Sequence, residues 1–595
     1  MILSKYFFVP CLGLALLLAG PGYGQKKQKK NKAETPAEQP LSFAQKDKKL
    51  DNREKEASES FFIEGMKYMM LEDFPKALER FQRAYAINSS NAALNYKIAQ
   101  TIMQMGRANE ALPFAQAAVN IDSSNPYYYL LLAQLFGGQN RYDDAIKVLT
   151  KLTKELPNTD QYLFQLADLY LAQNKYEDAL KTYDRIEKQY GFIEEIAYKK
   201  QQIYLRQNNL EKALKEGEQL ISSDPNEIRF TLAQAEMLAN NKKTDEAIVL
   251  VNKALKAEKN NAQAHLMLAE LYRQKGNLAE SEKELKLAFG NPGLEIDTKV
   301  KILIDYIRQM PVPPAKADPD LQDTALELAD LTIKTHPTEA KAYAVAGDVQ
   351  ALAQKKTDAR TNYLKALKLD NSHFKIWQQV IFLEAELAQT DSLVVHTEKA
   401  LELFPNQAML WFYNGTAYML KKEPARAIKS LEYGKKLTID NAELQNQFNI
   451  QLGDSYQSLK DYPKSDAAYE SVLAADPNNP HVLNNYSYYL SLRGQNLDKA
   501  KSMSEKLVKQ NPKEATYLDT HAWVLYKLKE YKEARKYLEE AVSLKKDADI
   551  LEHYGDVLYQ LGEKELALEQ WKKAKQIGKA SDLIDKKIKD KKLYE

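Results

Sequence analysis

Histidine, cysteine and serine are the side chains of this sequence that could do metal or covalent chemistry, and their spacing does not favour it. The seven histidines are scattered and form no H-E-x-x-H or comparable metal-binding pattern. Cys11 is the single cysteine and lies in an apolar N-terminal stretch, so the rest of the chain has no thiol. Ser543 and Lys546 match S-x-x-K, but the other motifs of the serine enzymes that use it are missing. We therefore expect a protein that is not an enzyme, with no catalytic residues, no metal and no cofactor.

The composition favours a soluble helical chain and excludes several function classes. Among 595 residues, 84 lysines and arginines oppose 82 aspartates and glutamates, so the net charge of +2 provides no field that would hold a nucleic acid. Glycine and proline number 21 each, which is too few for a typical sandwich or barrel. Hydrophobic residues make up 44% of the chain, yet no segment after the N-terminus is apolar enough to span a membrane.

The N-terminus has the pattern of an export signal. A lysine precedes an apolar run of about 15 residues that ends in small residues at an A-x-A-like site, so we expect a signal peptide over residues 1–24, cleaved after Gly24. A short membrane anchor and a lipid attached to Cys11 are the alternatives. Residues 25–57, rich in lysine, glutamate and glutamine, are expected to form a flexible tether. Its lysines either stay solvated or contact anionic lipid or a wall polymer.

Small residues recur in the sequence at a fixed step of 34. One column consists of Ala77, Ala111, Ala145, Ala179, Ala213, Ala247 and Ser281. A second column lies twelve residues ahead of it and consists of Gly65, Ala99, Ala133, Ala167, Gln201, Ala235 and Ala269. Because both columns keep one period through seven copies, they indicate a repeated structural unit.

Each copy is predicted to be a helix, a tight turn and a second helix. A polar turn such as 71–74 lies between the two columns, and both sides of it carry apolar residues at helical spacing. Small residues at the two columns allow the helix backbones to approach closely enough to interlock. Lys200 and Gln201 depart from this pattern, so the fifth copy would pack less closely.

This pattern resembles the tetratricopeptide repeat, whose motif combines an apolar residue, a small residue, tyrosine, alanine, an aromatic residue and proline. The best-matched copies hold Trp411, Gly415, Tyr418 and Ala427, and Leu452, Gly453, Tyr456, Tyr469 and Pro477. The resemblance covers about residues 58–578 and leaves no room for a catalytic domain. It implies an all-α fold, an α-solenoid wound as a right-handed superhelix of about 15 helix-turn-helix repeats. The final copies also resemble the repeats of large bacterial envelope proteins of this superfamily.

The period breaks at a proline-rich insertion near residues 309–320, which would form a protruding loop or interrupt the superhelix. We therefore expect an N-terminal array of about seven repeats over 58–291 and a C-terminal array of about eight repeats over 292–578. Residues 579–595 are expected to form a polar capping helix, with isoleucines on one side and lysines elsewhere.

Repeats of this kind line a concave groove with their first helices, so the resemblance implies a groove that binds peptide segments. The column three residues before the first small position is apolar and partly aromatic, and the column one residue after it is mostly polar. The two columns share one helix face, and rings beside amides and carboxylates suit an extended peptide. A helix one position out of this register would instead bury the rings in the core. The candidate groove residues are Phe62, Tyr96, Gln100, Gln134, Phe164, Asp168, Tyr198, Gln202, Glu236, Glu270, Phe412, Asn485, Tyr489 and Trp523.

In the second half, the corresponding positions form a more mixed and acidic surface. They include Phe412, Thr416, Asn485, Tyr489, Asp519, Trp523, Glu552 and Asp556. Trp523 and Tyr526 form either a pocket that anchors a peptide or the ordinary packing of motif aromatics.

We expect a non-enzymatic protein–protein interaction scaffold of the bacterial cell envelope, periplasmic or associated with the outer membrane after signal cleavage. Its partners would be peptide segments or envelope proteins, for example in outer-membrane protein assembly or secretion, with no nucleic acid and only peripheral membrane contact. Two alternatives stay open. One is an accessory protein bound to cell wall or polysaccharide, and the other is a cytosolic chaperone or regulatory adaptor.

Overall fold

The computed structural model describes residues 50–310, 319–578 and 581–594. Within these ranges the regular structure is helical and includes no strand, which confirms the predicted all-α class. None of the helices in these ranges has the length and apolar character needed to cross a membrane. The predicted signal peptide, residues 25–49 of the predicted tether and most of the proline-rich insertion lie outside the described residues.

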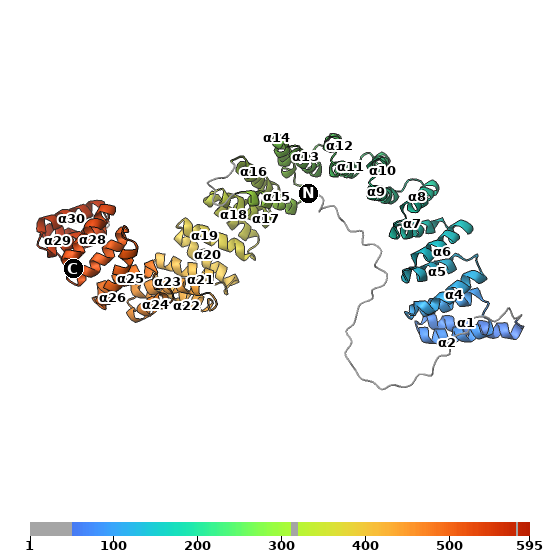
Figure 1. The fold of residues 1–595 in the computed structure, drawn as a ribbon, viewed down its shortest axis with the longest axis horizontal. Coiled ribbons are helices and arrows are strands. Elements are labelled where there is room, and N and C mark those ends of the chain that lie inside the picture. The colour runs from blue at the N-terminus through green and yellow to red at the C-terminus, as the bar shows by residue number, and fades with distance from the viewer. Residues whose placement is uncertain (1–49, 311–318, 579–580, 595) are drawn as a thin grey trace, which may run out of the picture. The chain divides into compact units, whose positions relative to one another are not determined.

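The helices follow one another in antiparallel pairs, each made of an A helix and a B helix (Figure 1). A tight turn joins the two helices in every pair except α15 (Ile296–Gln309) and α16 (Pro319–Thr335), whose link includes residues outside the described ranges. By its contacts the chain divides into two compact units, Met1–Glu216 and Gly217–Glu595. The helices that begin in the first unit are α1 (Asn52–Met70), α2 (Phe74–Ile87), α3 (Ala92–Gln104), α4 (Ala108–Ile121), α5 (Pro126–Gly138), α6 (Tyr142–Glu155), α7 (Leu163–Ala172), α8 (Tyr176–Tyr190), α9 (Glu194–Arg206) and α10 (Leu210–Ser223). A short 3₁₀ helix, η2 (Asp160–Tyr162), precedes α7.

The second unit continues the same alternation of A and B helices. Its first ten helices are α11 (Ile228–Asn240), α12 (Thr244–Ala257), α13 (Ala262–Gln274), α14 (Leu278–Phe289), α15 (Ile296–Gln309), α16 (Pro319–Thr335), α17 (Ala340–Leu352), α18 (Lys356–Leu369), α19 (Phe374–Glu386) and α20 (Thr390–Leu403). The rest are α21 (Ala408–Leu420), α22 (Pro424–Lys436), α23 (Ala442–Ser458), α24 (Tyr462–Ala475), α25 (Pro480–Arg493), α26 (Leu497–Gln510), α27 (Ala515–Lys527), α28 (Tyr531–Leu544), α29 (Ala548–Gln560), α30 (Lys564–Ile577) and α31 (Ile584–Asp590). Helices α1 to α30 thus form fifteen pairs, in agreement with the predicted number of repeats.

Outside the eighth pair, whose link includes residues beyond the described ranges, the turn between the A and B helices has a common geometry. The chain passes through the left-handed backbone region there, for example at Glu72, Gly106, Asn140 and Asn174, with φ between 56° and 77°. A left-handed residue just after a helix directs the next amide groups back to the last carbonyls of that helix. The polar turn seen in the sequence is therefore the C-terminal cap of the A helix.

The two small columns of the sequence lie where the A and B helices cross. Ala77, Ala111 and Ala145 have no exposed surface. A Cβ atom on Gly65 would lie 2.5 Å from the Phe81 ring, so the crossing leaves no room for a side chain there. In the fifth pair, the buried Gln201 Nε2 donates a hydrogen bond of 3.2 Å to the carbonyl of Ala213, so the departure from the small-residue pattern is accommodated without an open gap.

The ends of the repeat region differ from the expected boundaries. Helix α1 begins at Asn52 rather than at residue 58, because Asp51 and Glu54 form a reciprocal capping box at its N-terminus. The proline-rich insertion lies between α15 and α16, inside the eighth pair. The division between two repeat arrays at residue 292 stays a prediction, since the contacts of the chain divide it within α10 instead.

Candidate functional site

The predicted site residues lie on or beside one face of the A helices. We call this the A-helix face and define it by the side chains three residues before and one residue after the small residue of each A helix. Gln134 and Gln202 are exposed, and Trp523 is buried. The half-buried residues are Phe62, Tyr96, Gln100, Phe164, Asp168, Tyr198, Glu236, Glu270, Phe412, Asn485 and Tyr489.

The aromatic side chains of this face are partly exposed and partly packed against rings of neighbouring helices. The Phe62 ring lies 5.7 Å from the Phe81 ring of the partner B helix, and the Tyr96 ring lies 5.1 Å from that of Tyr128 in the next A helix. Partial burial raises the pKa of the Tyr96 hydroxyl above its ordinary value. The rings of Phe62 and Tyr96 are therefore half-buried, and the assignment of the column to partner binding stays a prediction.

A recurring pair of side chains, which we call the aspartate–aromatic pair, links the A-helix face to the B helix. In four repeats an aspartate directly follows the small residue of the A helix, and a tyrosine or tryptophan lies 15 residues later in the B helix. The four pairs are Asp168 with Tyr183, Asp348 with Tyr363, Asp454 with Tyr469, and Asp556 with Trp571.

In three of these pairs the aromatic side chain donates a hydrogen bond to the carboxylate. The distances are 2.6 Å from Tyr363 to Asp348, 2.5 Å from Tyr469 to Asp454, and 2.9 Å from Trp571 Nε1 to Asp556. The small residue before each of these aspartates is a glycine, and a Cβ atom there would lie 2.5–2.6 Å from the same aromatic ring. The glycine is therefore required because the ring crosses over it to reach the carboxylate.

Three of these aspartates each contact a residue of the next A helix, and that residue lies 31 positions further along the chain. Lys199 Nζ lies 2.8 Å from Asp168, Asn485 Nδ2 lies 3.2 Å from Asp454, and Lys587 Nζ lies 2.7 Å from Asp556. His481 Nε2 also approaches Asp454, at 3.3 Å. Asp454 and Asp556 thus connect neighbouring repeats as well as the two helices of their own repeat, whereas Asp168 makes only the contact to the next A helix.

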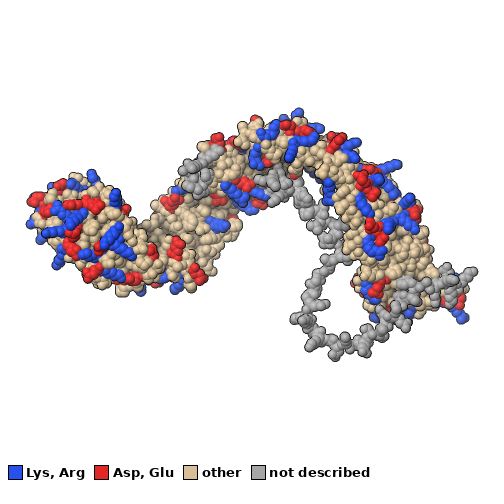
Figure 2. All heavy atoms as spheres, viewed as in Figure 1, with Lys and Arg blue, Asp and Glu red and all other residues tan. Residues whose placement is uncertain are grey.

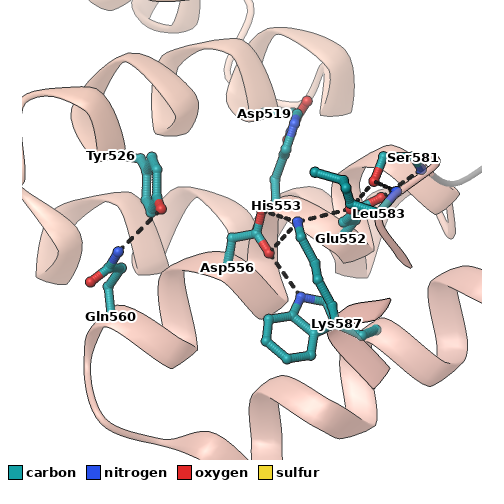
Figure 3. Close-up of polar contacts among 10 residues, drawn as sticks. Asp519, Tyr526, Glu552, His553, Asp556, Gln560, Ser581, Leu583 and Lys587 are labelled. Atoms are coloured by element: carbon teal, nitrogen blue, oxygen red, sulfur yellow. Dashed lines mark hydrogen bonds and ion pairs between the residues drawn. The ribbon is translucent and has the colours of Figure 1, made fainter. Parts of the chain in front are cut away.

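The C-terminal end of the chain shows the most complete version of this arrangement (Figure 3). Lys587 of α31 is buried and contacts Glu552 at 2.8 Å as well as Asp556 at 2.7 Å. Ser581 donates a backbone hydrogen bond to Glu552 at 2.8 Å and a side-chain hydrogen bond to the same carboxylate. Figure 3 shows Lys587 extending between the two carboxylates.

The acidic surface predicted for the last repeats is therefore wrong at Glu552 and Asp556. These two carboxylates are buried because α31 covers them and supplies the ammonium group of Lys587. Burial raises the pKa of Asp556 to about 6, in spite of the lysine. Burial also opposes ionisation of Glu552, but the hydrogen bonds from Lys587 and Ser581 hold the pKa of Glu552 below its ordinary value.

Trp523 and Tyr526 pack against each other and do not line an open pocket. Both residues are buried, and their rings stack with centroids 4.7 Å apart. Trp523 also stacks on His553, with centroids 4.1 Å apart, and His553 Nδ1 lies 2.9 Å from Asp519. Burial disfavours the charged imidazole, but the Asp519 carboxylate outweighs this and raises the pKa of His553. The prediction of Trp523 as a groove residue is therefore wrong, since the next A helix covers its ring.

The described residues contain no group of three or more histidine, cysteine, aspartate or glutamate side chains arranged to hold a metal ion. On the face drawn in Figure 2, basic and acidic side chains are interspersed rather than gathered into one large patch. The A-helix face offers rings, amides and single carboxylates, which are groups that can contact an extended peptide.

Comparison with protein families matches repeat models over much of the chain. Three models described as tetratricopeptide repeat match residues 68–135 and 238–289, residues 198–260 and 520–581, and residues 447–479. A model described as anaphase-promoting complex, cyclosome, subunit 3 matches residues 104–186. No curated protein matches the chain in sequence.

Three solved structures that resemble the chain are distant from it. A tetratricopeptide repeat protein from Parabacteroides merdae is 14% identical, with a TM-score of 0.37 over 42% of this chain and 98% of its own. The APC/C hetero-tetramer Cut9–Hcn1 is 13% identical, with a TM-score of 0.35 over 90% and 96% of the two chains. Yeast Tom70 is 16% identical, with a TM-score of 0.32 over 73% and 94%. At these TM-scores the likenesses do not bear on function.

Proposed function

We propose that this chain, which matches tetratricopeptide repeat models in five segments, is an exported, non-catalytic scaffold of the bacterial cell envelope that mediates protein–protein interactions. It binds peptide segments or partner proteins on its A-helix face. Outer-membrane protein assembly and secretion are the processes in which such a scaffold would work.

The observation that carries this proposal is the chemistry of the A-helix face in the first unit. Gln134 and Gln202 are exposed there, and the rings of Tyr96, Phe164 and Tyr198 are half-buried on the same face. Exposed amides supply donors and acceptors for the backbone of an extended segment, and half-buried rings supply apolar contact area at little entropic cost. The two exposed amides lie in the third and fifth pairs, beside half-buried rings that a bound segment can cover.

The envelope location is supported by the sequence. The apolar run and small-residue site of residues 1–24 fit a cleaved leader, and the single cysteine lies within that leader. The wall-bound accessory protein and the cytosolic adaptor are the competing interpretations, and they differ from the proposal in the state of the N-terminus or in the class of partner.

The proposal is tested by purifying the full chain from its own cells, sequencing its N-terminus and identifying the proteins bound to it. We expect an N-terminus at Gln25, with envelope proteins bound to the wild type and lost from a Gln134→Ala, Gln202→Ala double variant. Both side chains are exposed, so the double variant should keep its helicity and melting temperature. An intact Met1 with cytosolic partners, or binding to purified wall polymer alone, would overturn the proposal.

A further inference from the structure

Asp348 differs from the other members of the aspartate–aromatic pairs in having no partner in the next repeat. Its Oδ1 accepts the Tyr363 hydroxyl at 2.6 Å, and among the described residues its carboxylate makes no other hydrogen bond or ion pair. The residue 31 positions further along is Gln379, where the chain has Lys199, Asn485 and Lys587 in the equivalent places. Two of those three equivalents are lysines whose Nζ atoms lie 2.7–2.8 Å from the aspartate.

Asp348 is accessible to solvent as well as lacking a cationic partner among the described residues. Asp348 is exposed, whereas Asp556, its equivalent in the last repeat, is buried beneath α31. The residues four before and three after it on α17 are Ala344 and Ala351, whose small side chains do not extend over the carboxylate. The protein around it is nevertheless dense enough that desolvation raises the pKa of Asp348, although the Tyr363 hydrogen bond opposes the rise.

From this geometry we propose that Asp348 is a binding residue that receives a lysine or arginine side chain of the bound partner segment. The partner's cation takes the place that Lys199 and Lys587 occupy within the chain at Asp168 and Asp556. Tyr363 acts as a positioning residue, because its hydroxyl fixes one carboxylate oxygen and leaves the other for the ligand. This inference rests on the proposed function, since it concerns the specificity of the A-helix face.

A basic side chain is the occupant that the charges favour. One carboxylate with a hydrogen-bonded tyrosine attracts an ammonium or guanidinium group, and the described residues around it do not gather the further acidic ligands that a metal ion requires. The chain itself demonstrates the fit, because the equivalent carboxylate binds a lysine Nζ in two other repeats.

The test uses an array of immobilised peptides in which one central residue is lysine, arginine, glutamine or glutamate. The full chain is compared with Asp348→Asn and with Glu339→Gln, which removes an exposed charge at the start of the same helix. We expect the wild type and Glu339→Gln to prefer lysine and arginine peptides by about tenfold. The amide oxygen introduced by Asp348→Asn can still accept the Tyr363 hydrogen bond, so this variant should lose the preference and keep the melting temperature.

A second variant, Asp348→Lys, distinguishes a lost contact from a disturbed fold, because it should turn the preference toward glutamate peptides. If the wild type binds peptides without preferring basic ones, or if Asp348→Asn keeps the preference, the inference on Asp348 is overturned while the scaffold proposal stands. If the wild type binds none of the peptides, the proposed function fails first, and the inference fails with it.

Discussion

Lys587 Nζ lies 2.7 Å from Asp556 Oδ2, and this contact between α31 and α29 repeats the 31-residue spacing of Lys199 and Asp168 in the first unit. The short helix α31 thus stands where the A helix of a further repeat would stand. Terminal repeats need a cap because their outward face has no neighbour. Helix α31, which we call the cap, therefore covers α29 as the next A helix covers an A helix elsewhere in the chain, and a buried ion cluster holds it there.

Removing the cation of this cluster should loosen the C-terminal end. Lys587→Met leaves Glu552 and Asp556 buried without their ammonium partner. Removing one partner of a buried ion pair lowers the free energy of unfolding by about 3–5 kcal/mol. We expect faster hydrogen exchange in α29 to α31, with α1 to α10 unchanged. Lys589→Met is the control, because Lys589 is exposed. Equal exchange in the two variants would show that Lys587 does not hold the cap.

The glycine of the aspartate–aromatic pair should be intolerant of a methyl group. In Gly453→Ala the new Cβ would lie 2.5 Å from the Tyr469 ring, so we expect a loss of about 1–3 kcal/mol in the free energy of unfolding. Gly138 ends α5 with nothing within 4 Å of the position of its Cβ, so Gly138→Ala should be neutral or stabilising. Chemical denaturation of both variants checks this, and equal stabilities would contradict it.

The 34-residue period of the sequence is enough to predict the fold. Each copy needs small residues where its helices cross and a polar turn between them, and both features can be seen in the sequence. Ala77 and Ala145 lie at crossings as expected. The predicted tether extends several residues past the start of α1, because that segment is rich in lysine and glutamate, although Asp51 and Glu54 have the spacing of a capping box.

The site was harder to predict because burial depends on what covers a residue. Glu552 and Asp556 occupy face positions in the sequence, but a helix that begins 28 residues after Asp556 covers both. The position of Trp523 in the repeat similarly predicts a groove residue, but its ring is stacked against both Tyr526 and His553. The signal that could have revealed the cluster was the spacing itself, an aspartate after glycine with an aromatic residue 15 positions later and a lysine 31 positions later.

His521 should make the C-terminal repeats sensitive to acid. It is buried, its Nδ1 lies 2.8 Å from Ser504 Oγ, and burial lowers its pKa to about 4 from an ordinary value of 6.5. The unfolded chain therefore binds a proton between pH 6.5 and 4 that the folded chain excludes, so stability falls on acidification through this window by about 3 kcal/mol.

The raised pKa of Asp556, about 6, acts in the opposite direction between pH 6 and 4, because there the folded chain binds the extra proton. The difference between wild type and His521→Asn therefore isolates the histidine. We expect the urea midpoint, followed by tryptophan fluorescence, to fall more between about pH 7 and pH 4.5 in the wild type than in the variant. Parallel pH dependences would mean that His521 takes its proton in the folded state.

The most direct test of the scaffold account is photo-crosslinking in living cells. A photoreactive amino acid is placed either at Gln134, exposed on the A-helix face of α5, or at Lys154, exposed on the B helix α6 of the same repeat. The account predicts protein adducts from position 134 and few from position 154. Adducts at both positions alike, or at neither, would contradict the claim that the A-helix face binds the partners of this chain.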